Sequence, residues 1–356
     1  MVRHQSQLLA RLRVDGTPSG ATRTPFGAEG ETPMRNFKLI SATMSAVALT
    51  AVATVAGFSP VANAATKKTA KKATTTTAAP VTVAPTTTAA PAPTTTVAPA
   101  VGGATLDALK KAGKIRIGIK QNVPLIGLKN PVTNQYSGYD VEIAKIIAKA
   151  IFGDEKNRIE YVDASVSANR IPFITDNKAD IVIATFSITD ARKQQIDMAG
   201  PYFIAGQDIL AYKVELTGIK GPDDLNGRKV CAQSGSTSLT QLKAAAPKAS
   251  VIELPGVAEC VEALKDGRVD AVSTDDALLS GYAQKFPAFG IVGKQFSVEK
   301  YGIGLKKGDT AFRNYLNDVI EASYKDGSWK KAVDSTLGTG GVKTPAPPAV
   351  ERYAAL

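Results

Sequence analysis

Two junctions between an expected strand and an expected helix carry the residues best suited to bind an anion. Residues 184–192 read ATFSITDAR, and residues 233–238 read QSGSTS. Helix N-termini expose unpaired backbone N–H groups and the positive end of the helix dipole, and hydroxyl groups or a guanidinium beside them complete a carboxylate site. The alternative is that Thr189 and Ser236 are ordinary N-caps. Each junction alone therefore predicts either a cap or an anion site.

A third junction carries carboxylates instead. Residues 274–276 read TDD and follow the expected strand VDAVST (269–274). A carboxylate at this position would either hold an ammonium group or cap the next helix. Carboxylate capture in one place and ammonium capture in another would suit an α-amino acid.

The elements that must position these junctions alternate along residues 104–340. In DVEIAKIIAKAIF (140–152), apolar residues recur at the spacing of one helix face. Strand–helix alternation predicts an α/β class with largely parallel sheets, and the span is long for one small sheet, so we expect two lobes. The expected strands cover residues 114–119, 158–163, 180–186, 229–233, 251–254 and 269–274.

The charge distribution argues against a nucleic-acid partner. The 356 residues carry a net charge of +11, but residues 1–64 and the lysines within 67–72 supply most of the excess, and about +4 remains beyond residue 72. The one histidine is His4. Since no histidine lies in the region expected to fold, a Ser-His-Asp triad and histidine-ligated metal sites are excluded there, and we expect neither a metal nor a cofactor.

The N-terminal region has the pattern of a secretory signal peptide that starts at Met34. Two basic residues precede an apolar stretch (39–58), and a small-residue cleavage signal ends at Ala64. The alternative is an uncleaved membrane anchor. Residues 65–103 are rich in Thr, Pro and Ala, a composition typical of a disordered linker, which would either hold a domain away from the cell surface or be a neutral leader. We expect residues 1–64 to be the extension and signal peptide of a secreted protein.

The motifs along residues 105–338 resemble one family in wording and in order: the family 3 extracellular solute-binding proteins of polar amino acid ABC transporters. The phrase SITDARKQQIDMAGPYF (187–203) is highly specific to it. The other motifs are GKIRIG, SGYDVEIAKIIA, NRIPFI, GPDDLNGRKVCAQSGST, EALKDGRVDAV and YGIGLKKGD.

The resemblance implies a type II periplasmic-binding-protein-like fold, with a ligand cleft between two α/β lobes joined by two hinge strands. The hinges are expected near Ile209–Tyr212 and Gly293–Glu299. The implied parts are a larger lobe (104–209 plus 299–340), a smaller lobe (212–296) and a C-terminal tail (341–356).

The resemblance also assigns roles at the three junctions. Arg192 should hold the ligand α-carboxylate, because arginine offers a planar fork where lysine would be a point charge. Asp275 should hold the α-ammonium. Lys120 and Arg170 should face a distal carboxylate. The alternatives are a solvated loop lysine for Lys120 and a local cap or ion pair for Arg170. The candidate ligand-binding residues are Lys120, Arg170, Thr185, Ser187, Arg192, Ser236, Thr237 and Asp275.

Cys231 and Cys260 are the two cysteines of the chain. An even count in a secreted chain suggests a disulfide, and the chain is similar to glutamate-binding members of actinobacterial type that carry a matching pair. The alternative is two buried free thiols.

These expectations describe a monomeric extracellular protein that captures an amino acid by lobe closure and delivers it to membrane permease subunits. We expect glutamate or aspartate as ligand, with glutamine or asparagine next. Catalytic relatives on the same fold, such as dehydratases, form the alternative class. An enzyme would need an acid or base placed in the cleft, and beyond Glu299 near a hinge the sequence offers no such glutamate, so we expect no catalysis.

Overall fold

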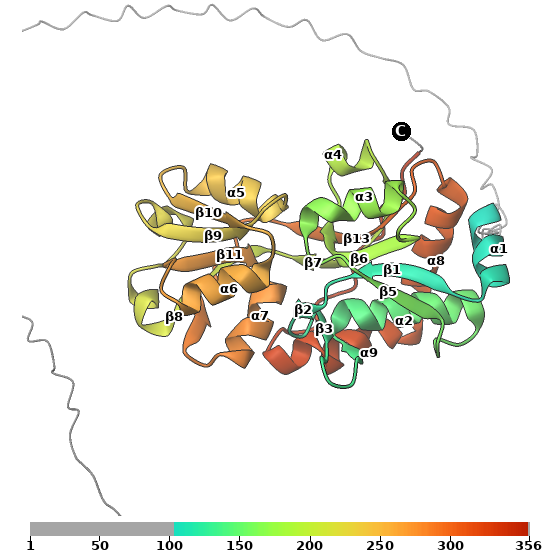
Figure 1. Ribbon diagram of the computed structural model, residues 1–356, viewed down its shortest axis with the longest axis horizontal. Helices are drawn as coiled ribbons and strands as arrows, with labels where there is room; N and C mark the ends of the chain where they lie inside the picture. The colour runs from blue at the N-terminus through green and yellow to red at the C-terminus, as the bar shows by residue number, and fades with distance from the viewer. Residues whose placement is uncertain (1–102, 355–356) are drawn as a thin grey trace, which may run out of the picture. The chain divides into compact units, whose positions relative to one another are not determined.

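The computed structural model describes residues 103–354 (Figure 1). The expectations for the signal peptide, for a start at Met34 and for the linker up to residue 102 lie outside the described residues. Gly103, expected to end the linker, is the first residue of helix α1 (Gly103–Ala112). Within residues 103–354, no helix has the length and apolar character needed to cross a membrane.

The larger lobe is built on a five-stranded sheet of order β5-β1-β6-β13-β7. Strands β1 (Ile115–Ile119), β5 (Ile159–Asp163) and β6 (Ile181–Ser187) are parallel, as strand–helix alternation predicts. Strand β13 (Glu299–Leu305) comes from much later in the chain and pairs antiparallel with both β6 and β7 (Asp197–Ala205). The lobe is therefore assembled from two separate stretches of sequence.

Helices cover both faces of this sheet. Helix α2 (Tyr139–Phe152) buries the apolar face that its sequence predicts and ends at Gly153, whose φ of 85° is the left-handed conformation of a glycine C-cap. The remaining elements are α1, α3 (Arg170–Thr175), α4 (Asp190–Lys193), α8 (Thr310–Asp326), α9 (Ser328–Ser335), the 3₁₀ turns η1 (Ser167–Asn169) and η4 (Leu337–Gly340), and a small sheet of β2 (Asn122–Val123), β3 (Gly127–Lys129) and β4 (Tyr136–Ser137).

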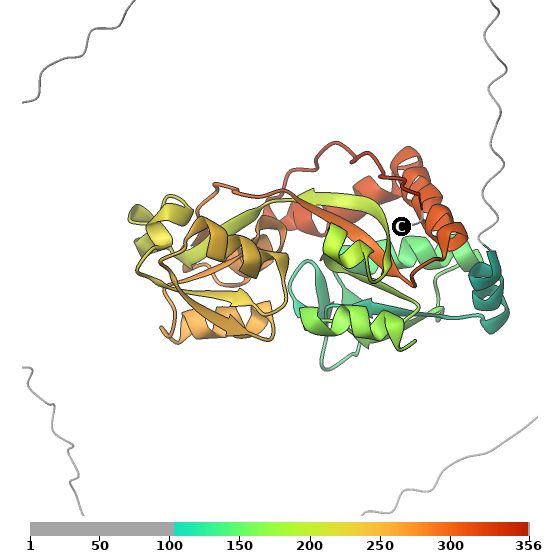
Figure 2. The ribbon, with the colours of Figure 1, turned by 90° about the horizontal axis from the view of Figure 1, so that it is seen from above.

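The smaller lobe has its own five-stranded sheet, of order β10-β9-β11-β8-β12, and Figures 1 and 2 show it beside the larger lobe. Its strands are β8 (Gln207–Tyr212), β9 (Lys229–Gln233), β10 (Ser250–Leu254), β11 (Ala271–Asp275) and β12 (Phe289–Ile291). Its helices are α5 (Thr237–Ala245), α6 (Val257–Lys265) and α7 (Asp276–Lys285), with 3₁₀ turns η2 (Lys213–Thr217) and η3 (Pro222–Leu225).

The chain crosses between the lobes twice, and the first crossing differs from the expectation. Strand β8 pairs with β11 from Gln207 onward, so the chain leaves the larger lobe at Gly206 and not at 209–212. The physical reason is strand pairing: the carbonyl of Gly206 already accepts the backbone N–H of Asp276 at 2.9 Å, and Gln207 lies opposite Asp275 in the sheet of the smaller lobe. The second crossing, residues 292–298, overlaps the expected hinge.

The expected disulfide is confirmed. Cys231 on β9 and Cys260 on α6 are both fully buried and bonded, with their Cα atoms 5.4 Å apart. The bond ties a strand to the helix that covers it, next to the loop that enters α5. The smaller-lobe side of the candidate site is therefore braced covalently.

Replacing both cysteines by alanine is expected to lower the free energy of unfolding by about 3–4 kcal/mol, because the bond closes a loop of 29 residues in the unfolded chain. Denaturant unfolding of the wild-type and double-variant chains measures the difference. The wild-type chain under reducing conditions is the control and should unfold with the variant. Equal unfolding midpoints for oxidised wild type and variant would contradict this role of the bond.

Candidate functional site

All eight predicted residues line one cavity between the lobes. Lys120, Arg170, Thr185, Ser187 and Arg192 reach it from the larger lobe. From the smaller lobe come Ser236, Thr237 and Asp275. The lining residues that the sequence did not predict are Ser167, Gln233, Ser238, Thr274 and Leu278.

The two lobes touch across this cavity. Ser187 Oγ and Thr237 Oγ1 are 3.3 Å apart, and Gln233 Nε2 donates to the carbonyl of Ser165 at 2.6 Å. The enclosed space is about 10 Å³, room for about one water molecule. A ligand larger than one water molecule can therefore enter only when the lobes move apart. The hydrogen bond from Gln233 to Ser165 joins the two lobes in this closed arrangement.

Arg192 occupies one end of the cavity. It lies on α4, where its guanidinium donates to the carbonyl of Ser187 at 2.6 Å and lies 4.5 Å from the ring centroid of Phe186. Burial lowers the pKa of Arg192 to about 10, so the side chain remains cationic at neutral pH. The geometry leaves a fixed positive charge with a restricted orientation, as carboxylate recognition requires.

The capping alternative is correct for the two hydroxyl residues at the junctions. Thr189 caps α4 by accepting the backbone N–H of Arg192 at 3.2 Å, and Ser236 caps α5 by accepting that of Leu239 at 3.1 Å. Helix α4 spans only four residues. Its dipole is therefore small, and the attraction for an anion at this junction depends on the guanidinium of Arg192.

Thr185 has a strained backbone that the sequence did not predict. Its φ of 46° is rare for a β-branched residue. Its N–H donates to Asp140 Oδ2 at 2.9 Å, and the other oxygen of Asp140 accepts the hydroxyl of Tyr202 at 2.7 Å. Fully buried Asp140 thus holds the strained residue at the cavity wall.

Asp275 is buried and does not cap the helix that follows it. Within residues 103–354 no α7 backbone N–H donates to its side chain, which instead accepts the hydroxyls of Tyr301 at 2.7 Å and Ser238 at 3.3 Å. Burial, assisted by nearby Glu299, raises the pKa of Asp275 to about 7. A carboxylate in this environment gains from a cationic partner, so the capping alternative is wrong and the ammonium alternative remains.

A pH dependence of binding follows from this raised pKa. If Asp275 must be ionised to accept an ammonium group, affinity should be constant above about pH 7 and fall about tenfold per pH unit below it, because the proton then competes with the ligand. Calorimetric titrations between pH 5.5 and 8 test this. The Asp275→Asn chain should bind weakly with no such slope. A wild-type affinity that is constant down to pH 5.5 would contradict the role of Asp275.

Lys120 and Arg170 lie at the side of the cavity that belongs to the larger lobe, and neither is solvated. They are 2% and 3% exposed, so the loop-lysine alternative is wrong. Arg170 makes one local contact, from Nε to the carbonyl of Ala164 at 3.2 Å, while its buried Nη2 has no hydrogen-bond partner among the described residues. Burial and the charge of Arg170 place the pKa of Lys120 well below its usual value.

Glu299 is a further buried residue that the sequence did not assign to the site. It begins β13 and accepts the hydroxyl of Thr237 at 2.9 Å and that of Ser297 at 3.2 Å. The Thr237 hydroxyl must therefore turn away from Glu299 before it can donate to a ligand. The described residues contain no group of three or more His, Cys, Asp or Glu side chains arranged to hold a metal ion.

Comparison with known proteins places this geometry in context. The family model described as bacterial extracellular solute-binding proteins, family 3, matches residues 115–339. The ABC transporter glutamine-binding protein GlnH of Bacillus subtilis is 40% identical over 226 residues, covering 63% of this chain and 81% of the relative. The glutamate-binding protein GluB of Corynebacterium glutamicum is 34% identical over 251 residues, covering 68% and 84%.

Solved structures show the same fold. An ancestral arginine-binding protein bound to glutamine is 36% identical, with a TM-score of 0.59, and the match covers 64% of this chain and 98% of that structure. An ancestral amino acid-binding protein described as a precursor of cyclohexadienyl dehydratase is 32% identical, with a TM-score of 0.59, and the match covers 65% and 99%. The expected two-lobed, type II architecture is thereby confirmed.

Proposed function

Because the chain belongs to the bacterial extracellular solute-binding proteins of family 3, we propose that it captures an amino acid between its lobes and delivers it to the membrane permease of an ABC importer. The observation that supports this most is the pairing of opposite charges in one cavity. Arg192 from the larger lobe and Asp275 from the smaller lobe both line it. A ligand that carries a carboxylate and an ammonium on the same carbon atom, as an α-amino acid does, would join the lobes through both charges.

Lobe closure is the mechanism that this arrangement supports. Each lobe alone offers a partner for only one of the two charged groups on the ligand's α-carbon, so a bound amino acid gains its second charged contact there only when the lobes approach. The difference in contacts between open and closed forms would shift their populations toward the closed form, which is the form a permease would receive.

We propose an acidic side chain, glutamate or aspartate, for the ligand. Lys120 and Arg170 form a buried cationic pair, and the unpartnered Nη2 of Arg170 leaves a donor for a distal carboxylate. The relationship to GluB, a glutamate-binding protein, supports this choice. A distal carboxylate would relieve the repulsion between the two cations, whereas an amide would do so only through its dipole.

Glutamine is the second candidate, and two observations favour it. The Bacillus subtilis relative and a 41% identical protein of Geobacillus stearothermophilus are both glutamine-binding proteins. In addition, burial and the nearby charge of Arg170 lower the pKa of Lys120, so the cavity disfavours its cationic form and a neutral side-chain amide is compatible with it. Each of these two observations reduces the affinity advantage expected for glutamate over glutamine.

Titration calorimetry of the purified chain with six amino acids tests the proposal. Glutamate, aspartate, glutamine, asparagine, arginine and histidine form the panel. The proposal expects tight binding of glutamate or aspartate, and a clear preference for glutamine would retain the transport function while replacing the ligand. No heat with any of the six would contradict an amino-acid carrier of this type, and conversion of a ligand would indicate a catalytic relative.

A further inference from the structure

The helix that presents Arg192 is too short to hold its own shape. Helix α4 is one turn, Asp190–Lys193, and a single hydrogen-bonded turn is unstable in isolation. The cap at Thr189 fixes its start. Its last residue, Lys193, must therefore be held by the rest of the lobe.

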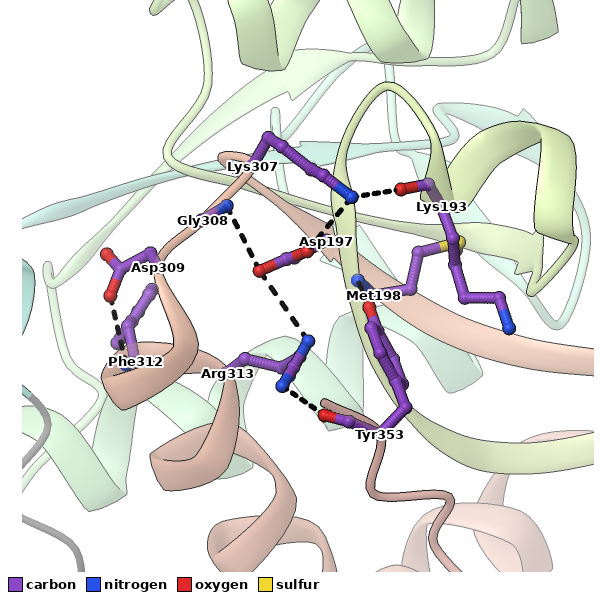
Figure 3. A network of polar contacts seen from close by, with 9 residues as sticks. All are labelled: Lys193, Asp197, Met198, Lys307, Gly308, Asp309, Phe312, Arg313 and Tyr353. Carbon is purple, nitrogen blue, oxygen red and sulfur yellow. Dashed lines mark hydrogen bonds and ion pairs between the residues drawn. The ribbon is translucent and has the colours of Figure 1, made fainter. Parts of the chain in front are cut away.

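Two side chains from distant parts of the sequence hold Lys193 (Figure 3). Lys307, at the end of β13, donates from Nζ to the carbonyl of Lys193. Tyr353, near the C-terminus, places its ring 5.2 Å from Lys193 Nζ, within cation–π range. The side chain of Lys193 is 19% exposed, and its Nζ also forms an ion pair at 2.8 Å with Asp190 of the same turn, whose side chain is largely exposed.

Tyr353 is itself fixed on three sides. The guanidinium of buried Arg313 lies 3.9 Å from the centre of its ring and donates to its carbonyl. The backbone N–H of Met198 donates to the Tyr353 hydroxyl oxygen at 2.8 Å. The carboxylate of buried Asp197 lies 3.7 Å from Arg313 and 3.9 Å from Lys307, so it links Lys307, which holds Lys193, to Arg313, which holds Tyr353 (Figure 3).

The rest of the C-terminal segment is tied to the same lobe, along which it lies in Figure 2. The backbone N–H of Glu351 donates to the carbonyl of Gly200 at 2.7 Å. Arg352 forms ion pairs with Asp318 and Glu321 at 2.6 and 3.0 Å, both partly exposed. The contacts of Glu351 and Arg352 thus hold the segment independently of α4, in addition to the contacts of Tyr353.

We propose that Tyr353 is a positioning residue for ligand binding: its ring holds Lys193 and thereby the one-turn helix that presents Arg192. The inference rests on the proposed role of Arg192 in holding the ligand carboxylate. It extends the site to a residue outside the stretch matched by the family model, 115–339.

Three full-chain variants test it: Tyr353→Ala, Tyr353→Phe and Arg352→Ala. Tyr353→Ala is expected to weaken amino-acid binding about tenfold, the size of one cation–π contact of intermediate strength. Tyr353→Phe keeps the ring and should bind within about twofold of wild type. Arg352→Ala removes only partly exposed ion pairs of the same segment and should bind as wild type.

Hydrogen exchange of residues 189–196 supplies a readout that does not need a ligand. Tyr353→Ala should speed exchange there, while Tyr353→Phe and Arg352→Ala should not. Unchanged exchange and affinity in Tyr353→Ala, or equal losses in Tyr353→Ala and Arg352→Ala, would overturn the inference. If the wild-type chain binds no amino acid, the proposed function fails, and the exchange result still decides whether Tyr353 fixes α4.

Discussion

Replacing Arg192 by alanine is expected to weaken amino-acid binding at least about 30-fold, because truncating one partner of a buried charge pair costs about 2–5 kcal/mol. The ligand carboxylate would be left in a closed cavity without its cation. Calorimetric titration of the variant with the best ligand of the wild-type chain measures the loss. The affinity of Arg192→Lys should lie between those of the wild-type and Arg192→Ala chains, since lysine supplies the charge but not the planar fork.

Two controls make this result specific to the site. Arg158→Ala removes an arginine of the same lobe whose partner, Asp154, is largely exposed, and it should bind as wild type. Thermal unfolding should show Arg192→Ala to be folded, because its guanidinium makes one hydrogen bond to the described residues, to the carbonyl of Ser187. Wild-type affinity in a folded Arg192→Ala chain would contradict the assignment of the carboxylate site.

Replacing Arg170 by methionine is expected to weaken the binding of glutamate much more than the binding of glutamine. Affinity for glutamate should fall about 100-fold, through loss of a charge-assisted contact in a buried site, while affinity for glutamine should fall less than about tenfold. Without ligand, the variant should be at least as stable as wild type, because the substitution removes a buried guanidinium with an unpartnered Nη2.

Titrations of one variant with two ligands contain their own control for misfolding, since both ligands share the α-carboxylate and α-ammonium. Equal losses for glutamate and glutamine would place Arg170 outside the side-chain subsite. A glutamine loss larger than the glutamate loss would reverse the proposed preference and support an amide ligand.

The sequence predicted the residues that carry charge into the cavity, since each of them lies at a strand end or in the segment that follows a strand, where local pattern and family motif coincide. Arg192 and Asp275 are examples, and both line the cavity. The disulfide was also predicted, from the even count of two cysteines in a chain expected to be secreted and from the matching pair in similar proteins. Local sequence pattern alone could not decide, at each junction, between a helix cap and a ligand-binding role.

Local sequence pattern could not predict the residues that support the site residues, because the partners in these contacts lie far apart in the chain. Asp140 supports Thr185 across 45 positions of sequence, and Tyr301 reaches Asp275 across 26. The crossing at Gly206 was misplaced for a similar reason: the apolar run that follows it reads the same in either sheet, and only pairing with β11 decides. Such contacts depend on the tertiary arrangement, which local sequence pattern does not determine.

The pairing of Arg192 with the ligand carboxylate and of Asp275 with its ammonium is the central claim, and one wild-type titration series tests it most directly. The best amino acid of the panel is compared calorimetrically with its decarboxylated amine and its deaminated acid. We expect each derivative to bind at least about 100-fold more weakly, because each leaves one buried charge of the cavity unpaired. Binding of either derivative as tightly as the amino acid would contradict the account.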